Sequence, residues 1–243
     1  MSLDQTANLK YSDKAAAMLA AMEHAPRFNS WMAATLKPFL GDRVLEIGAG
    51  IGNLTRLLCA NQTLYVVSDV DPVHLAQLRN EMRSRSNVSV IACDLENTTD
   101  FLQFQGRMDT AICINVLEHI QDDLRGLRNL RTALALGGRA IVLVPQGESV
   151  YGTMDETLGH YRRYSKAELE ARMREAGFRA EGILEFNRIT YPGWFLNGRI
   201  LRRRSVSRVQ LWLFDLLVPL WRRIDPHLPW PPTSLIGVGV RET

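Results

Sequence analysis

Short apolar runs alternate with amphipathic stretches through residues 43–145 of this 243-residue chain. Apolar runs of about four to eight residues that are rich in Val and Ile indicate strands buried on both faces. The predicted strands are residues 43–47, 64–68, 88–92, 108–114 and 139–144, and the predicted helices between them are residues 53–60, 72–84 and 122–136. This alternation predicts a parallel, doubly wound α/β sheet with right-handed crossovers.

Residues at the ends of these segments support the helix boundaries. Asp71 precedes Pro72, and aspartate is a preferred N-cap residue while proline suits the first helical turn. Gly137 and Gly138 follow the last predicted helix and are expected to end it, because glycine readily adopts the backbone conformation of a helix C-terminus.

The pattern changes after residue 145. A loop is expected to about residue 164, followed by a helix over 165–175 with Ser165 as its cap, and by a strand over 178–185. Residues 187–233 have no clean helical or strand period, and a last strand covers 234–241. Residues 187–233 are therefore expected to be an inserted helical segment, and long insertions in compact domains are usually functional.

The length of the chain suits a single domain. We expect N-terminal helices over 1–40 (at 13–25 and 28–37), a cofactor-binding core over 41–186, the insertion 187–233 and a final strand over 234–243. The polar N-terminus lacks the apolar core of a signal peptide, and no apolar run reaches the ~18 residues of a membrane span. Three cysteines without a C-x-x-C pair indicate reduced thiols in a cytoplasmic protein.

The net charge of +3 is unevenly distributed along the chain. From Arg188 to the end there are nine arginines, no lysine and three acidic residues, a net charge of +6, so the rest of the chain carries −3. The basic character therefore belongs to the C-terminal part, which contains the insertion.

The candidate chemistry starts with a glycine loop after the first predicted strand. The stretch VLEIGAGIGNLT contains Gly48, Gly50 and Gly52, and Asn53 occupies the position of the third glycine of a dinucleotide-binding loop. Asp69 ends the second strand, 21 residues after Gly48. At that distance a carboxylate accepts hydrogen bonds from both hydroxyls of a ribose.

Two further acidic residues narrow down the ligand. Asp94 follows the third strand, where it can accept a hydrogen bond from an exocyclic amine such as that of adenine. Glu46 lies two residues before the glycine loop and would repel a phosphate but suits a cation or an amino group. Together these features indicate an adenosine without phosphates and with a positive charge, which is S-adenosylmethionine.

Four motifs occur in the order and spacing of class I S-adenosylmethionine-dependent methyltransferases. EIGAGIG, SDVDP, CDLEN and INVLEHI resemble motifs one to four of this family, over about residues 40–145. The resemblance implies a Rossmann-like, seven-stranded, mostly parallel sheet with an antiparallel last strand. It also implies cofactor contacts: Gly48 and Gly50 at the methionine part, Asp69 at the ribose, Asp94 and the Leu95 backbone at the adenine, and Asn115 at the methionine end.

Each of these residues also has a purely structural interpretation. The glycines can serve only a tight turn, and Asp69 can serve as a helix cap, although Asp71 is better placed for that. Asp94 and Asn115 can be turn residues.

The motifs exclude several classes of acceptor. Enzymes that methylate nucleobase amines usually carry Asn or Asp followed by Pro-Pro and an aromatic residue at the end of the fourth strand, where this chain has INVLEHI. No glutamate pair typical of protein arginine methyltransferases is present. Capping explains Asp122 and Asp123 without a metal ion, so no metal is expected. LEHI resembles the small-molecule branch, and O-methylation of a small acceptor is the predicted reaction.

A hydroxyl acceptor needs a base, and His119 and His160 are the candidates. His119 directly follows the fourth strand, and His160 lies in GHYRRYS, after the fifth strand. In the same stretch, Arg162 and Arg163 between Tyr161 and Tyr164 are candidate substrate contacts, since arginine binds carboxylate or phosphate with a bidentate fork. A structural histidine and a solvated arginine pair are the plain alternatives.

The insertion combines apolar and basic residues. Residues 209–221 are almost all apolar, and arginines flank them on both sides. This composition is typical of an interfacial helix on an anionic membrane, so peripheral contact through 194–223 at the inner membrane face stays open. A lid over the acceptor pocket and a homodimer contact are the alternatives. The clustering of aromatic residues with leucines argues against nucleic acid.

Two other functions remain open at this point. One is a cofactor-binding regulatory or scaffold module that has the methyltransferase fold but no turnover. The other is an NAD-dependent dehydrogenase, which Asn53 and Glu46 disfavour because both argue against a bound pyrophosphate.

Overall fold

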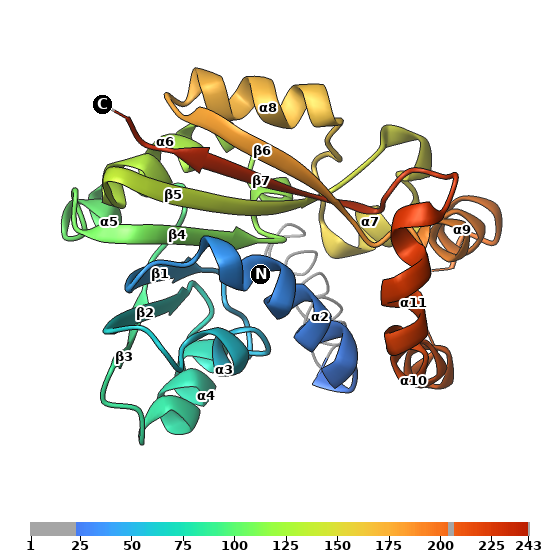
Figure 1. Cartoon of the computed structure of the whole chain (residues 1–243), viewed down its shortest axis with the longest axis horizontal. Coiled ribbons are helices and arrows are strands. Elements are labelled where there is room, and N and C mark those ends of the chain that lie inside the picture. The colour runs from blue at the N-terminus through green and yellow to red at the C-terminus, as the bar shows by residue number, and fades with distance from the viewer. Residues whose placement is uncertain (1–22, 204–206, 243) are drawn as a thin grey trace, which may run out of the picture.

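A seven-stranded sheet forms the centre of the computed structural model, which describes residues 23–203 and 207–242 (Figure 1). The strand order is β3-β2-β1-β4-β5-β7-β6. The strands are β1 Arg43–Ile47, β2 Leu64–Asp69, β3 Val88–Ala92, β4 Met108–Ile114, β5 Leu134–Pro145, β6 Arg179–Phe186 and β7 Ser234–Val240. Strands β1 to β5 pair in parallel, while β7 is antiparallel to β5 and β6. The predicted fold class is confirmed.

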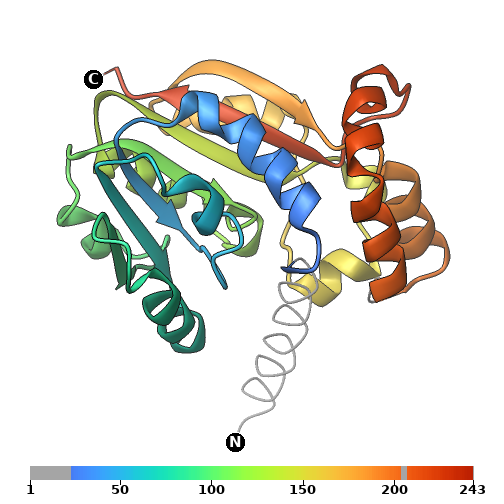
Figure 2. The same cartoon turned by 60° about the horizontal axis from the view of Figure 1, so that its bottom comes forward.

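Helices cover both faces of the sheet (Figures 1 and 2). The helices are α2 Pro26–Leu36, α3 Thr55–Leu58, α4 Pro72–Met82, α5 Thr98–Leu102, α6 Asp123–Ala133, α7 Thr153–Leu158, α8 Lys166–Glu175, α9 Tyr191–Trp194, α10 Arg208–Leu216 and α11 Val218–Ile224. Helices α2, α3, α4 and α11 pack into one core, and α5, α6 and α8 pack into the other. Successive residues of β5 alternate between the cores, with Ile141 in the first and Val142 in the second, because strand side chains point to opposite faces.

The predicted helix caps are confirmed. The Asp71 carboxylate accepts a hydrogen bond from the Val73 amide at the start of α4, and Ser165 and Glu168 form a capping box at the start of α8. The predicted helix at 13–25 lies largely outside the described residues.

Strand β5 begins at Leu134, five residues before the start at residue 139 that Gly137 and Gly138 had indicated. Helix α6 ends at Ala133, and β5 starts at Leu134, which is fully buried and pairs with Met108. Gly137 and Gly138 therefore lie inside the strand and do not end the helix. Burial of Leu134 against β4 outweighs the local helix-ending signal, as tertiary packing commonly outweighs propensity.

The insertion folds into a helical arm whose boundaries the sequence pattern did not predict. It contains α9, a π-helix at Phe195–Ile200, α10 and α11. Pro192 and Pro219 occupy the first turns of α9 and α11, where proline is tolerated. Helix α10 and the start of α11 carry apolar residues on their exposed side as well as on their packed side. The sequence therefore lacks the apolar and polar alternation from which helix boundaries are predicted.

Two buried carboxylates hold the arm: Asp215 attaches it to the rest of the domain, and Asp225 ties its two ends together. Asp215 of α10 accepts a hydrogen bond from the Phe28 amide at 2.9 Å, at the N-terminus of α2. Asp225 accepts a hydrogen bond from the Ile189 amide at 2.8 Å. Asp215, which interrupts the apolar run in the sequence, thus satisfies the exposed N–H groups of a helix start.

Candidate cofactor and acceptor site

The predicted cofactor residues meet at one edge of the sheet. Strands β1 to β4 are parallel, so their carboxyl ends lie together. Gly48 follows β1, Asp69 ends β2, Asp94 follows β3 and Asn115 follows β4. Ligands of open α/β sheets bind at this edge.

The glycine loop has a backbone that other residues adopt with strain. Gly48, Gly50 and Gly52 have φ angles of 69°, 57° and 80°. A Cβ atom on Gly48 would lie 2.3 Å from Cγ2 of Val116, and one on Gly52 would lie 2.8 Å from Cδ2 of Leu78. Glycine therefore lets the loop pass close to the end of β4, with no side chain between the loop backbone and a ligand at this edge.

Replacing Gly48 by alanine is expected to destabilise the protein by roughly 2–4 kcal/mol, from the left-handed backbone and from overpacking against Val116. Urea denaturation of Gly48→Ala, Val116→Ala and the double variant measures both contributions. The double variant should lose less unfolding free energy than the two single variants lose together, because Val116→Ala removes the methyl group with which the new Cβ clashes. Purely additive losses would contradict this interpretation.

Asp69 is held as a buried, ionised carboxylate. Its Oδ2 accepts a hydrogen bond from the Gly50 amide at 2.7 Å, and its Oδ1 accepts one from the Asp71 amide at 2.9 Å. Nδ1 of His74 lies 3.3 Å from Oδ1. Burial raises the pKa of Asp69, but the hydrogen bonds from His74 and the backbone outweigh burial and lower the pKa below its usual value. A carboxylate in this state can accept hydrogen bonds from ribose hydroxyls.

Glu46 lies beneath the loop, in contact with neighbouring elements. Its Oε2 accepts hydrogen bonds from Oγ1 of Thr55 at 2.7 Å and from the Tyr65 hydroxyl at 2.8 Å. Burial raises its pKa, while these two hydrogen bonds oppose the shift. The carboxylate therefore ties α3 and β2 to the first strand, and a direct contact with the cofactor stays a prediction.

The remaining cofactor candidates lie in exposed turns at the same edge. Asp94 is exposed and accepts a hydrogen bond from the Glu96 amide at 2.9 Å. The Leu95 carbonyl accepts one from Asn129 of α6 at 2.8 Å, which fixes this turn. Asn115 is exposed and has a φ angle of 53°, a conformation that asparagine tolerates.

Directly after β4, Glu118 and His119 lie in a short 3-10 helix, Leu117–His119. Glu118 is fully buried, and neither carboxylate oxygen has a hydrogen-bond partner among the described residues. Burial raises the pKa of Glu118 to about 8. His119 is partly exposed, and burial followed by the neighbouring His160 lowers its pKa to about 4. The two imidazole rings lie 4.7 Å apart in an edge-to-face arrangement.

His160 and Arg163 share one buried carboxylate. Nδ1 of His160 lies 2.9 Å from Oδ1 of Asp155, and Nε of Arg163 donates to the same oxygen at 2.8 Å. The Arg163 guanidinium also lies 5.1 Å from the centre of the Trp194 ring. Asp155 was not identified from the sequence, because it belongs to α7, a helix that the sequence analysis took for loop.

Of the other predicted acceptor contacts, Arg162 and Tyr164 are bound to a buried carboxylate, whereas Tyr161 is exposed. Arg162 forms an ion pair with the buried carboxylate of Asp123 at 3.0 Å, and the Tyr164 hydroxyl donates to that carboxylate at 3.0 Å. Tyr161 is 59% exposed. Asp123 thus does more than begin a helix, and binding of an acceptor anion by Arg162 or Arg163 stays a prediction.

Comparison with known proteins gives consistent matches. Residues 45–140 match a family model described as a methyltransferase domain. A ubiquinone biosynthesis O-methyltransferase of Xanthomonas euvesicatoria pv. vesicatoria is 27% identical over 183 residues, which are 69% of this chain and 74% of that protein. Residues 45–140 are thus a methyltransferase domain. Together with the seven-stranded fold, these matches support a class I S-adenosylmethionine-dependent methyltransferase.

Solved structures share the fold of this methyltransferase. An S-adenosylmethionine-dependent methyltransferase from Mesorhizobium loti superimposes with a TM-score of 0.60 at 16% identity, over 86% of this chain and 96% of that one. One chain of a complex that contains the Haloferax volcanii Trm112 methyltransferase activator gives a TM-score of 0.62 at 16% identity, over 90% of both chains.

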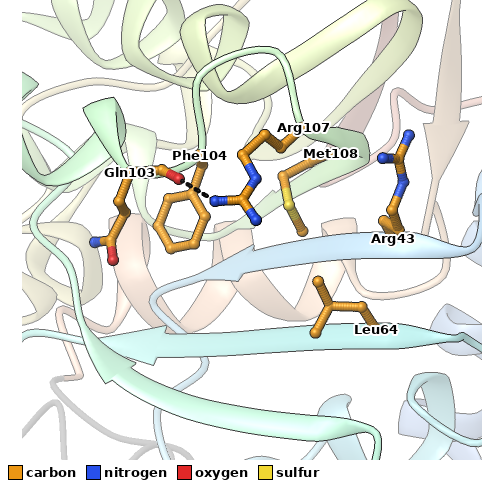
Figure 3. A pocket seen from close by; sticks show the side chains of 6 residues that line it. All are labelled: Arg43, Leu64, Gln103, Phe104, Arg107 and Met108. Atoms are coloured by element: carbon orange, nitrogen blue, oxygen red, sulfur yellow. Dashed lines mark hydrogen bonds between the residues drawn. The ribbon is translucent and has the colours of Figure 1, made fainter.

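Two cavities flank the sheet of the methyltransferase. A cleft of ≈ 590 Å³ lies between the start of α6 and the 160–165 region, with Glu96, Asp122, Arg162 and Tyr164 in its lining. A smaller cavity of ≈ 210 Å³ lies at the opposite edge, beside the first residues of β1, β2 and β4 (Figure 3). The larger cleft borders the predicted adenine turn and the acceptor side, whereas the smaller one is remote from both.

Proposed function

We propose that this methyltransferase transfers a methyl group to the oxygen of a small, apolar acceptor. The observation that carries the proposal is the pair of histidine rings, His119 and His160, which lie 4.7 Å apart, with His119 in the short helix that follows β4. The similarity to O-methyltransferases of ubiquinone biosynthesis over 69% of the chain supports an oxygen acceptor.

His119 is the better placed of the two histidines to take up a proton. It is partly exposed, whereas His160 is buried and held by Asp155. Bound S-adenosylmethionine supplies an electrophilic methyl group at this edge. The acceptor hydroxyl loses its proton to the imidazole, its oxygen forms the new O–C bond, and the C–S bond breaks to leave S-adenosylhomocysteine. Exposed Tyr161 is an acceptor contact in this arrangement.

Turnover with methyl-labelled S-adenosylmethionine and an apolar cell extract tests the proposal. We expect release of S-adenosylhomocysteine together with a labelled product that resists alkali, as a methyl ether does and an ester does not. His119→Gln should lower turnover by roughly 10²–10⁴-fold, the usual contribution of a general base. Tight binding of the cofactor without any turnover would favour the regulatory or scaffold function instead.

The arm supports an acceptor that is taken from a membrane surface. Residues at positions i, i+3, i+4 and i+7 of α10 form an exposed apolar stripe, which continues with the residue between α10 and α11 and with one residue in the first turn of α11. Its members are Val209, Trp212, Leu213, Leu216, Leu217 and Leu220, each between 39% and 65% exposed. Such a stripe normally faces a protein core. In this arm a different side packs against the domain core, through Phe214, Asp215 and Val218.

Basic residues border this stripe. Arg208 begins α10, and Arg222 and Arg223 lie in the last turn of α11, all of them exposed. Exposed apolar residues with a rim of arginines fit an anionic lipid surface, where each basic residue near the surface contributes about 1 kcal/mol. No helix within residues 23–203 and 207–242 is long and apolar enough to cross a membrane. In Figure 1 the arm lies beyond the carboxyl ends of β4 and β5, on the side of the predicted acceptor site.

Co-sedimentation with vesicles tests the membrane contact. Binding to vesicles with roughly 30% phosphatidylglycerol is expected at low salt, and Trp212→Glu with Leu216→Glu should weaken it at least about tenfold. Leu136→Glu is the matched control, because Leu136 is 69% exposed but lies on β5, away from the arm. An absence of vesicle binding together with loss of a dimer in the double variant would favour a homodimer contact instead.

A further inference from the structure

Three side chains beyond the end of β4 form a compact group of potential metal ligands. Ligand atoms of Glu118, His119 and His160 all lie within 4.8 Å of one another. Oε1 of Glu118 is 4.0 Å from Nε2 of His160. The chain brings His160 to this position on the loop after β5, so the group exists only in the folded protein.

The Glu118 carboxylate lacks a partner that its burial requires. Its side chain is 1% exposed, and neither oxygen accepts a hydrogen bond from the part of the chain that the structure describes. Arg163, the nearby buried cation, directs its N–H groups to Asp155 and to the Gln146 carbonyl. A buried carboxylate without a compensating charge or hydrogen bond is strongly unfavourable. A cation between this carboxylate and the two imidazoles would remove the penalty.

The two imidazoles are oriented as metal-binding histidines usually are. Such histidines donate their second ring N–H to a carboxylate or a backbone carbonyl, which fixes the ring and leaves the other nitrogen for the ion. Nδ1 of His160 lies 2.9 Å from Oδ1 of Asp155, so Nε2 faces Glu118. The His119 ring lies 4.7 Å from the His160 ring, edge to face, and burial lowers its pKa more than the backbone at Gly159 and Leu158 raises it.

We propose that Glu118, His119 and His160 bind a divalent transition-metal ion such as Zn²⁺. Two imidazoles and one carboxylate are a ligand set that suits such ions, and three protein ligands leave a fourth position open. Tetrahedral coordination with bonds of about 2.0–2.2 Å places ligand atoms roughly 3.4 Å apart, so the side chains must draw together by about 1 Å. Capping had explained the neighbouring Asp122 and Asp123 without a metal, and the new site does not use them.

The role of the ion rests on the proposed function. The acceptor hydroxyl occupies the open position, where the ion lowers its pKa and its proton passes to solvent water. The oxygen then forms its bond to the methyl carbon, and the C–S bond breaks with its electron pair going to sulfur. In the metal-loaded protein His119 is therefore a ligand of the ion, whereas in the metal-free protein its imidazole takes up the proton, as in the proposed function.

Metal content is the direct test of the site. The full chain is stripped with EDTA, loaded with Zn²⁺, desalted and analysed by mass spectrometry of the metal. We expect about one ion per chain, and Co²⁺ loading should give the visible absorption of a four-coordinate site. Glu118→Gln and His160→Gln should each weaken Zn²⁺ binding at least about tenfold. His227→Gln, a change of an exposed histidine on the arm, should bind as the wild type does.

The outcomes separate this proposal from methyl transfer. Wild-type protein without bound ion, or unchanged binding in the Glu118 and His160 variants, overturns the metal site whatever the activity. A bound ion with no turnover supports the site and contradicts the proposed function. If a buried variant fails to fold, the wild-type stoichiometry, the Co²⁺ spectrum and the partly exposed His119→Gln variant still decide the question.

Discussion

Replacing Asp69 by alanine is expected to lower the affinity for S-adenosylmethionine by at least about 100-fold, which corresponds to roughly 2.7 kcal/mol. The carboxylate is held ionised by His74 and by the Asp71 and Gly50 amides, and it would accept two charge-assisted hydrogen bonds from the hydroxyls of a ribose. The change also removes the acceptor that orders the Gly50 amide in the glycine loop. Isothermal titration calorimetry with the cofactor measures the loss.

Asp71→Ala provides the matched control for this experiment. The Asp71 side chain caps α4, while its backbone amide, which contacts Asp69, is unchanged by the substitution. Its expected effect is a stability loss of about 1 kcal/mol with an unchanged cofactor affinity. Equal affinities for the Asp69 variant and the wild type would show that Asp69 serves only the loop.

The second large effect is expected from Asp155→Ala. Asp155 is fully buried and shared by His160 and Arg163, and the Arg163 side chain is 1% exposed. Removing one partner of a buried ion pair leaves the other charge uncompensated, which costs about 3–5 kcal/mol. For a chain of this size, Tm should fall by roughly 10 °C. Thermal denaturation followed by circular dichroism measures the change.

Glu156→Ala is the control, since Glu156 is exposed in the same turn of α7. Its expected effect is within about 0.5 kcal/mol of the wild type. Asp155→Asn retains a hydrogen-bond acceptor without the charge and should lie between the two. A loss below about 1 kcal/mol for Asp155→Ala would mean that Arg163 finds another partner or reaches water.

Much of the sheet could be predicted from local sequence. Residues 43–47, 88–92 and 108–114 were predicted with the boundaries that β1, β3 and β4 have in the structure. These strands are short, apolar and flanked by polar turn residues, so their local pattern has no competing interpretation. The start of β5 was missed, because the pairing of Leu134 with Met108 is a long-range contact that no local pattern carries.

The cofactor half of the candidate site could be predicted from local sequence, whereas part of the acceptor half could not. Gly48, Asp69, Asp94 and Asn115 were identified because each follows a predictable strand, and parallel strands bring their ends to one edge. Asp155 and the buried state of Glu118 were not identified. Both depend on how the loop after β5 folds back over the end of β4, where the Tyr161 amide donates to the Glu118 carbonyl at 2.8 Å.

The insertion shows why pattern alone was insufficient for the arm. Its apolar residues cover two opposite sides, one packed on α2 and one exposed. The sequence shows that both sides of these helices are apolar, but it does not show which side packs against the rest of the domain. Docking of Asp215 on the start of α2 decides this, and it leaves Trp212 and Leu216 on the outer side.

The sequence by itself determined the fold class, the cofactor and the edge of the sheet at which the predicted site residues meet, because short-range patterns and the parallel topology specify them. Only the tertiary structure decided which charged residues are already paired inside the protein. Arg162 and Arg163 resembled an anion clamp in sequence, yet each lies against a buried carboxylate. It also decided that the Glu118 carboxylate has no hydrogen-bond partner within residues 23–203 and 207–242. Burial and pairing depend on contacts between segments far apart in the chain, and these contacts exist only after folding.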